Sequence, residues 1–203
     1  MASPPADRDA WDERYRSKDS VWGAAANRFV VEAFAGRPVG RALDLACGEG
    51  RNALWLAGLG WTVTAVDFAD TAVERGRQAS QAAGLGVEWI TDDLLSYEPA
   101  PGSFDAVLIA YLHLPAEQMA TVLERAAAAL APGGMLMLVG HDVRNLTEGV
   151  GGPQDAALLH TPERVVAHLD GLRVERAESV DRPVEAAPRP AVDTLVVAVK
   201  PED

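Results

Sequence analysis

Short apolar runs alternate with longer amphipathic stretches along most of the chain. The runs are rich in Val, Leu, Ile and Ala, which is typical of strands buried on both faces of a parallel sheet. They predict strands at residues 42–47, 61–66, 87–91, 103–110 and 135–140. Between them, apolar positions recur at helical spacing and predict helices at residues 52–58, 69–83 and 115–130. Strands that alternate with helices in this way predict an α/β fold.

The N-terminal segment follows a different pattern. Residues 1–10 show no apolar periodicity, and we expect them to be disordered. Residues 11–40 are expected to form a helical lid or cap, with a short amphipathic helix at residues 27–34. Trp11 and Tyr15 lie one helical turn apart, so both rings can clip a helix onto the body of the protein.

The C-terminal segment predicts two further strands. Residues 172–180 alternate between polar and apolar positions, which is typical of a half-buried strand, and residues 194–199 form an apolar run. No linker or repeat interrupts the chain, so we expect one domain over residues 1–203.

The net charge of the chain limits the kinds of molecule that it is expected to bind. The chain has 30 acidic residues against 18 Lys and Arg, a formal net charge of −12. That balance argues against non-specific binding to nucleic acid or to an anionic membrane. There is no membrane-length apolar run and no N-terminal signal pattern, and the single cysteine, Cys47, can form no internal disulfide. We therefore expect a cytoplasmic protein with neither nucleic acid nor membrane as a partner.

The chemistry is concentrated after the first strand. Gly48 and Gly50 allow a tight turn that brings bare backbone close to a ligand, and the next strand ends in Asp67, which can accept both hydroxyls of a ribose. This unit suits either a dinucleotide or S-adenosylmethionine. Asp44, a buried acid just before the turn, favours S-adenosylmethionine, because it would repel a pyrophosphate but tolerate an amino-acid tail beside a sulfonium.

An acid-bearing apolar strand followed by Gly-x-Gly-x-Gly resembles the class I S-adenosylmethionine-dependent methyltransferases. Ala46 stands at the first glycine position, where the resemblance implies a slightly altered turn. A helix, the Pro-Gly-Gly turn at residues 132–134 and an apolar strand recur at the same place in that family. The resemblance implies a Rossmann-like three-layer sandwich. In such a fold the sheet would have seven strands, mostly parallel, with an antiparallel C-terminal strand.

The opening residues suggest a narrower resemblance. Trp-Asp-Glu-Arg-Tyr at residues 11–15, Val-Trp-Gly at residues 21–23 and Gly-Glu-Gly-Arg-Asn at residues 48–52 look most like small bacterial methyltransferases of the tellurite-resistance and thiopurine S-methyltransferase type. That likeness implies a small methyl acceptor with a soft sulfur, selenium or tellurium nucleophile, methylated by direct in-line transfer. The protein would act as a monomer or homodimer.

The resemblance also implies roles for single residues. Phe68 would pack on the adenine, or it belongs to the ordinary core. Asp93 would accept a hydrogen bond from the adenine amino group, or it is a solvated helix-capping acid. The Leu94 amide would reach a ring nitrogen. Trp22, before a glycine, suits a lid over the ligand. The predicted cofactor-binding residues are Trp22, Asp44, Ala46, Gly48, Gly50, Arg51, Asp67, Phe68, Asp93, Leu94 and Ala110. No metal site is predicted.

Candidate catalytic residues follow the fourth and fifth strands. Tyr111 is predicted to form the pocket wall beside the transferred methyl, and His141 is the first choice for a base if the nucleophile is oxygen or nitrogen. A soft nucleophile would need no strong base. Arg144, close to Asp142, could hold an anionic substrate or belong to a solvated loop. His113 could face the substrate or cap a loop.

Two other functions fit the same residues. A nicotinamide-dependent oxidoreductase is suggested by Gly48-x-Gly50-x-x-Ala53, but Asp44 and the lack of a Tyr-x-x-x-Lys pair count against it. A non-catalytic S-adenosylmethionine-binding regulatory protein would need the same cofactor site, so the sequence leaves that alternative open.

Overall fold

The computed structural model describes residues 7–18, 21 and 23–202. Trp22, predicted to line the pocket, lies outside the described residues. The strands are β1 (Arg41–Leu45), β2 (Thr62–Asp67), β3 (Val87–Thr91), β4 (Phe104–Ala110), β5 (Leu130–His141), β6 (Arg173–Arg182) and β7 (Ala191–Val199). The helices are α1 (Arg8–Arg16), α2 (Arg28–Phe34), α3 (Arg51–Gly58), α4 (Asp70–Ala83), α5 (Ala116–Ala129), α6 (Asn145–Glu148) and α7 (Pro162–Val166), with a 3-10 turn η1 (Ala156–Leu158).

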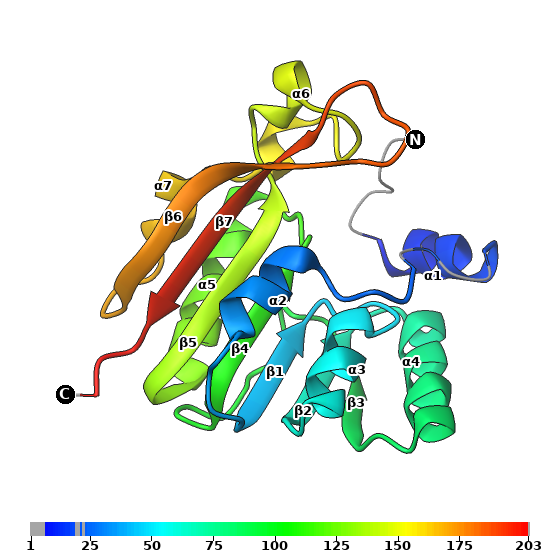
Figure 1. Cartoon of the computed structure of the whole chain (residues 1–203), viewed down its shortest axis with the longest axis vertical. Helices are drawn as coiled ribbons and strands as arrows, with labels where there is room; N and C mark the ends of the chain where they lie inside the picture. The colour runs from blue at the N-terminus through cyan, green and yellow to red at the C-terminus, as the bar shows by residue number, and fades with distance from the viewer. Residues whose placement is uncertain (1–6, 19–20, 22, 203) are drawn as a thin grey trace.

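The strands form a seven-stranded sheet in the order β3-β2-β1-β4-β5-β7-β6 (Figure 1). β7 runs antiparallel to both of its neighbours, and the other pairs are parallel. This confirms the predicted fold class: a Rossmann-like three-layer sandwich with a mostly parallel sheet and an antiparallel C-terminal strand. No helix among the described residues has the length and apolar character needed to cross a bilayer.

Helices cover both faces of the sheet, and each face has its own apolar core. One core joins α2 and α3 to the sheet through residues such as Phe34, Leu56 and Met137. The other joins α5 and α7 through residues such as Leu123 and Val165. Because side chains alternate along a strand, Leu43 and Leu45 of β1 enter the second core, while Asp44 points to the α3 side.

The structure corrects several boundaries, and β7, for example, begins at Ala191 and not at residue 194. Helix α1 begins at Arg8, capped by the Asp7 carboxylate, which accepts a hydrogen bond from the Asp9 amide, so residues 8–10 are helical and not disordered. β5 begins at Leu130, which pairs with Phe104, so the predicted Pro-Gly-Gly turn lies inside an irregular start of that strand. The apolar run alone could not show this, because backbone pairing there depends on a neighbouring strand.

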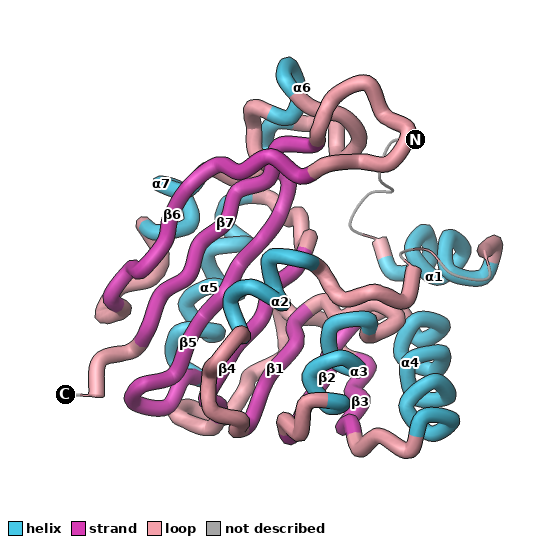
Figure 2. The backbone as a smooth tube through the Cα atoms, in the orientation of Figure 1, coloured by secondary structure: helices cyan, strands magenta, loops and turns pink. Residues whose placement is uncertain are grey.

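Helix α1 lies against α4, whereas α2 lies against the sheet (Figure 2). Tyr15 is buried against Ala69 and Ala72, and Trp11 packs beside it with ring centroids 5.9 Å apart. The Asp12 carboxylate accepts a hydrogen bond from the Thr71 amide at 2.9 Å. The predicted clip formed by the two aromatic rings is confirmed.

Candidate functional site

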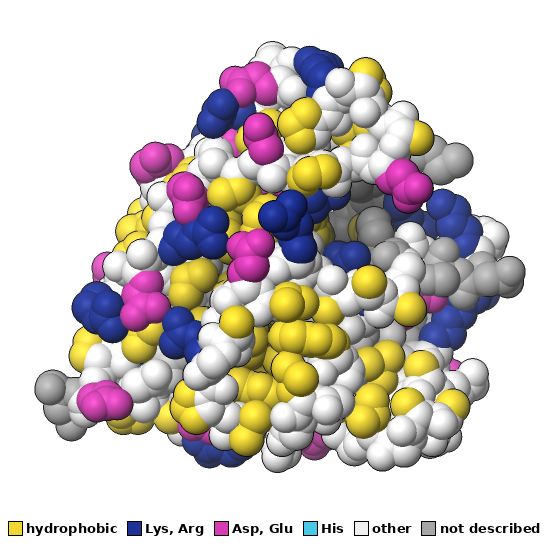
Figure 3. All heavy atoms as spheres, in the orientation of Figure 1, with side chains coloured by type: hydrophobic (Ala, Val, Ile, Leu, Met, Phe, Trp, Pro, Cys, Tyr) yellow, Lys and Arg dark blue, Asp and Glu magenta, His cyan; other side chains and the backbone are white. Residues whose placement is uncertain are grey.

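A cavity of about 780 Å³ opens where the parallel strands end. β1 and β4 are neighbours here, and chain connections leave them toward opposite sides of the sheet, which is where open α/β sheets bind their ligands. In the space-filling view, a hollow lies beside α1 with basic side chains at its margin (Figure 3). Of the predicted site residues, the cavity is lined by Ala46, Gly48, Arg51, Asp67, Phe68, Asp93, Leu94, Ala110, Tyr111 and His141.

The glycine turn forms the floor of one half of the cavity. Ala46 has a φ of 59°, in the left-handed region that glycine adopts most easily, so this alanine carries backbone strain. Gly50, with a φ of 79°, does not line the cavity but packs against the Trp89 ring. Ala46 therefore adopts the backbone conformation that a glycine at its position would adopt most easily.

Asp67 ends β2 at the edge of this turn. One carboxylate oxygen accepts a hydrogen bond from the Gly48 amide at 2.8 Å, and the other accepts one from the Ala69 amide at 3.0 Å. Burial raises the pKa of Asp67, and these amides oppose the rise. The two bonds fix the carboxylate on the cavity wall while each oxygen keeps a lone pair for a ligand hydroxyl.

The predicted adenine residues lie together on the same side. Phe68, Asp93 and Leu94 all line the cavity. One oxygen of Asp93 accepts a hydrogen bond from the Leu95 amide at 2.9 Å, which holds the carboxylate in place. Their contact with an adenine stays a prediction.

Asp44 differs from what we expected. It is fully buried, lies outside the cavity lining, and neither of its oxygens hydrogen-bonds to any described residue. Asp44 therefore does not hold the glycine turn, whose amides donate to the Asp67 carboxylate and to the Cys47 carbonyl. Burial raises the pKa of Asp44 to about 7, and the positive charge of Arg51 partly offsets that rise.

This carboxyl makes the ligand-free protein less stable as pH rises. An unfolded chain would ionise it near 3.8, whereas the folded protein keeps its proton to about 7, so its stabilising contribution is present below pH 4 and is lost as pH rises to 7. The loss is about 4 kcal/mol at ~1.4 kcal/mol per pH unit. The side chain introduced by Asp44→Asn cannot ionise. Between pH 4 and pH 7 we therefore expect the free energy of unfolding of the variant, measured by urea denaturation, to rise by about 4 kcal/mol relative to that of the native protein. A difference independent of pH would contradict the assignment.

A polar network lies behind Tyr111, which lines the other half of the cavity. Its hydroxyl donates to the Asp193 carboxylate at 2.7 Å and accepts from the Asn27 side-chain amide at 3.1 Å. The Arg182 guanidinium donates to the same oxygen of Asp193 at 2.6 Å. The hydroxyl is therefore occupied, and the guanidinium groups of Arg51 and Arg182 lie over the Tyr111 ring, 5.8 Å and 5.4 Å from its centroid. The role of Tyr111 as the wall beside the transferred methyl stays a prediction.

Three histidines stack behind this wall. The ring of His113 lies between those of His141 and His160, with centroids 5.4 Å and 5.3 Å away. The Nε2 atom of His113 accepts a hydrogen bond from the backbone amide of His141 at 3.1 Å. Burial lowers the pKa values of His113 and His160, so both stay neutral. His113 and His141 line the cavity.

The rest of the expected charged cluster lies elsewhere. Asp142 is buried and accepts hydrogen bonds from the Ser179 and Thr194 hydroxyls, both at 2.7 Å. Arg144 is exposed and pairs with Glu148 one helical turn later, so it does not line the cavity. The interpretation of Arg144 as a substrate clamp is therefore wrong, because the chain turns into α6 directly after β5.

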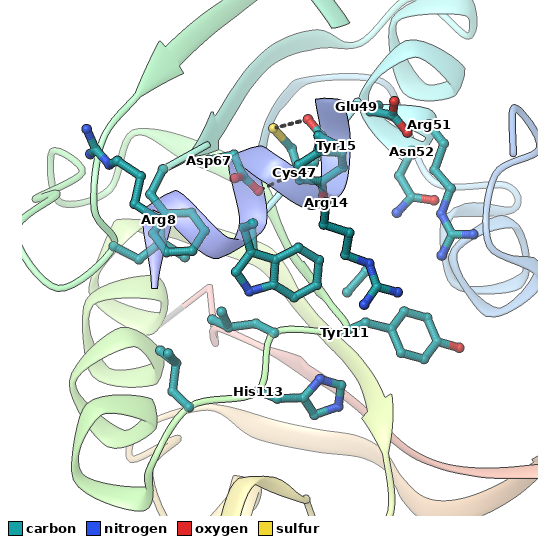
Figure 4. Close-up of a pocket in the computed structure, with 18 of the residues that line it drawn as sticks. Arg8, Arg14, Tyr15, Cys47, Glu49, Arg51, Asn52, Asp67, Tyr111 and His113 are labelled. Atoms are coloured by element: carbon teal, nitrogen blue, oxygen red, sulfur yellow. Dashed lines mark hydrogen bonds between the residues drawn. The ribbon is translucent and has the colours of Figure 1, made fainter. Parts of the chain in front are cut away.

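Several site residues were missed in the sequence. Arg14 extends from α1 toward Tyr111 across the cavity (Figure 4), and Trp11 and Tyr15 line the same wall. The Glu49 carboxylate, also in the lining, forms an ion pair with the Arg75 guanidinium at 3.0 Å. Trp11, Arg14 and Tyr15 are spaced along one face of a helix, but no local pattern shows that this face lines the same cavity as the glycine turn.

The sheet order, with a glycine turn after β1 and an acid at the end of β2, gives the chain the fold of the class I S-adenosylmethionine-dependent methyltransferases. The family model described as a methyltransferase domain matches residues 42–134, from β1 to the irregular start of β5. S-adenosylmethionine is the methyl donor of that class.

Curated relatives match about half of the chain. A ribosomal RNA small subunit methyltransferase C from Chromohalobacter salexigens is 36% identical over 120 residues, which are 54% of this chain and 34% of the relative. A ubiquinone biosynthesis O-methyltransferase from Xanthomonas campestris pv. campestris is 34% identical over 113 residues, which are 53% of this chain and 46% of the relative. This chain thus spans less than half the length of these relatives, and their acceptors differ.

Solved structures match nearly the whole chain. A protein studied for the conversion of a disulfide bond into a thioacetal group during echinomycin biosynthesis has a TM-score of 0.80 at 22% identity, over 97% of this chain and 92% of the other. The N-methyltransferase NodS from Bradyrhizobium japonicum, solved with S-adenosyl-L-homocysteine, has a TM-score of 0.72 at 22% identity, over 95% and 97%. TehB from Haemophilus influenzae has a TM-score of 0.71 at 18% identity, over 95% of this chain and 66% of the other. These likenesses show the fold.

Proposed function

We propose that the protein is a methyltransferase that moves a methyl group from S-adenosylmethionine to a small-molecule acceptor. The observation that carries the proposal is the Asp67 carboxylate, fixed by the Gly48 and Ala69 amides on the wall of the cavity. These residues fit the donor, because a fixed carboxylate with free lone pairs suits the two hydroxyls of a ribose. Phe68, Asp93 and Leu94 would hold the adenine.

The acceptor would occupy the half of the cavity beyond Tyr111. That half is mostly apolar, with a few polar groups from the histidines and one amide. Its lining residues are Leu112, His113, Leu114, Gln118, His141, Gly152, Pro153 and Leu158. We propose a small acceptor with a soft nucleophile, a thiol or a selenium or tellurium compound. Support comes from the N-terminal motif, which resembles that of small bacterial methyltransferases with such acceptors. The bound donor supplies an activated methyl group, and the protein positions the acceptor and excludes water.

The test separates this function from its two rivals. We expect S-adenosylhomocysteine, but not NAD or NADP, to raise the melting temperature, and S-adenosylmethionine with a panel of thiols, selenite and tellurite to yield S-adenosylhomocysteine. A shift with NAD alone would support an oxidoreductase. Binding of S-adenosylhomocysteine without turnover of any acceptor would favour a regulatory binding protein.

A further inference from the structure

His141 on β5 and Asp193 on β7 lie directly opposite each other on neighbouring strands. They are register partners in the antiparallel pair of β5 and β7, so their side chains lie opposite one another on the same face of the sheet. The Nδ1 atom of His141 lies 3.3 Å from one oxygen of Asp193. Both atoms are buried, and neither makes a well-aligned hydrogen bond with any described residue.

The surroundings leave Nδ1 of His141 and this oxygen of Asp193 to interact with each other. The second oxygen of Asp193 already accepts from Tyr111 and Arg182. Although burial alone would raise the pKa of Asp193, its hydrogen bonds and the charge of Arg182 lower it, so the carboxylate stays ionised. An ionised acceptor facing Nδ1 favours a proton on Nδ1, and the neutral ring then carries a bare lone pair on Nε2.

The ring of His141 is also fixed in place. His113 stacks on it with an interplanar angle of 20°. Gly152 lies so close that a Cβ atom there would fall 2.6 Å from Cδ2 and 2.9 Å from Nε2 of His141. A ring held by neighbours on both sides and oriented by a carboxylate is preorganised to take a proton.

We propose that His141 is the base of this site, that Asp193 positions it, and that the acceptor therefore enters as a neutral molecule whose nucleophilic atom carries a proton. The inference rests on the proposed function and narrows its acceptor class. The acceptor's nucleophilic atom bonds to the methyl carbon, the carbon–sulfur bond of the donor breaks with its electron pair left on sulfur, and the acceptor's proton passes to Nε2 of His141. Oxyanions such as tellurite would not need this machinery.

The first experiment reads the tautomer without any acceptor. Long-range ¹H–¹⁵N correlation spectra would be recorded on the protein with S-adenosylhomocysteine, and His141 would be assigned from His141→Gln. We expect Nδ1 of His141 to carry the proton in the native protein and Asp193→Asn to shift the population toward Nε2–H. Asp181→Asn, an exposed change on β6, should leave the tautomer unchanged. A native His141 protonated at Nε2 would overturn the proposal, even if calorimetry shows that S-adenosylhomocysteine binds.

The second experiment compares two thiols that differ in ionisation. Benzyl mercaptan is largely protonated near pH 7, whereas 4-nitrothiophenol is already a thiolate. We expect His141→Gln and Asp193→Asn to lower kcat for benzyl mercaptan by about 10²–10⁴, and to leave kcat for 4-nitrothiophenol within about threefold. Equal losses for both thiols would mean a structural role. If neither thiol is methylated, the tautomer measured in the first experiment decides whether the proposal stands. If the native protein does not bind S-adenosylhomocysteine at all, the proposed function itself is rejected.

Discussion

Replacing Asp67 by alanine is expected to weaken the binding of S-adenosylhomocysteine by at least about a hundredfold. The change removes two charge-assisted hydrogen bonds to the ribose, each worth about 1.5–3 kcal/mol, and about 3 kcal/mol corresponds to a factor of more than a hundred. It also leaves the Gly48 and Ala69 amides without their acceptor. Isothermal titration calorimetry of the two proteins with S-adenosylhomocysteine measures the effect.

Asp70→Ala is the matched control. Asp70 begins α4, is exposed and does not line the cavity, so its removal should change the affinity by less than about twofold. Should Asp67→Ala fold poorly, Asp67→Asn keeps the shape and one acceptor oxygen, and a loss of about tenfold is expected. A folded Asp67→Ala protein with native affinity would refute the ribose assignment and, with it, the main support for the proposed function.

Gly50→Ala is expected to lower the free energy of unfolding by about 3 kcal/mol. Two costs add. An alanine at a φ of 79° costs roughly 1–2 kcal/mol, and its Cβ atom would fall 2.1 Å from the Trp89 ring, an overlap that costs about 1–3 kcal/mol. Trp89 cannot easily move away, because its ring also lies against Gly76 and its Nε1 donates to the Ser80 hydroxyl at 3.1 Å.

Gly84→Ala separates these two costs. Gly84 has a φ of 68°, but no atom lies within 4 Å of the site of a new Cβ atom, so only the backbone cost of about 1 kcal/mol is expected. Urea denaturation of both variants measures the difference. Equal losses would show that Trp89 is free to move, whereas a larger loss for Gly50→Ala would show that the packing of β3 holds the glycine turn in place.

Periodicity predicted most of the fold because the sheet buries both faces of its strands. A parallel strand covered on each side must be apolar along its length, so β2, β3 and β4 could be placed within about a residue or two. The boundaries that were wrong depend on long-range pairing or on a cap. β5 starts early because Leu130 pairs with Phe104, and α1 starts early because Asp7 caps it.

The sequence by itself determined the half of the cavity that contains the glycine turn and Asp67, because one short segment of the chain builds that half. The glycine turn and Asp67 follow from the order strand, turn, helix, strand, and parallel strands bring their carboxyl ends to one edge. Only the tertiary structure decided the other half. Asp193 reaches His141 through an antiparallel register, and Arg14 reaches the cavity because α1 packs on α4. Pairings between distant segments depend on how the elements pack, which a local pattern of residues does not contain.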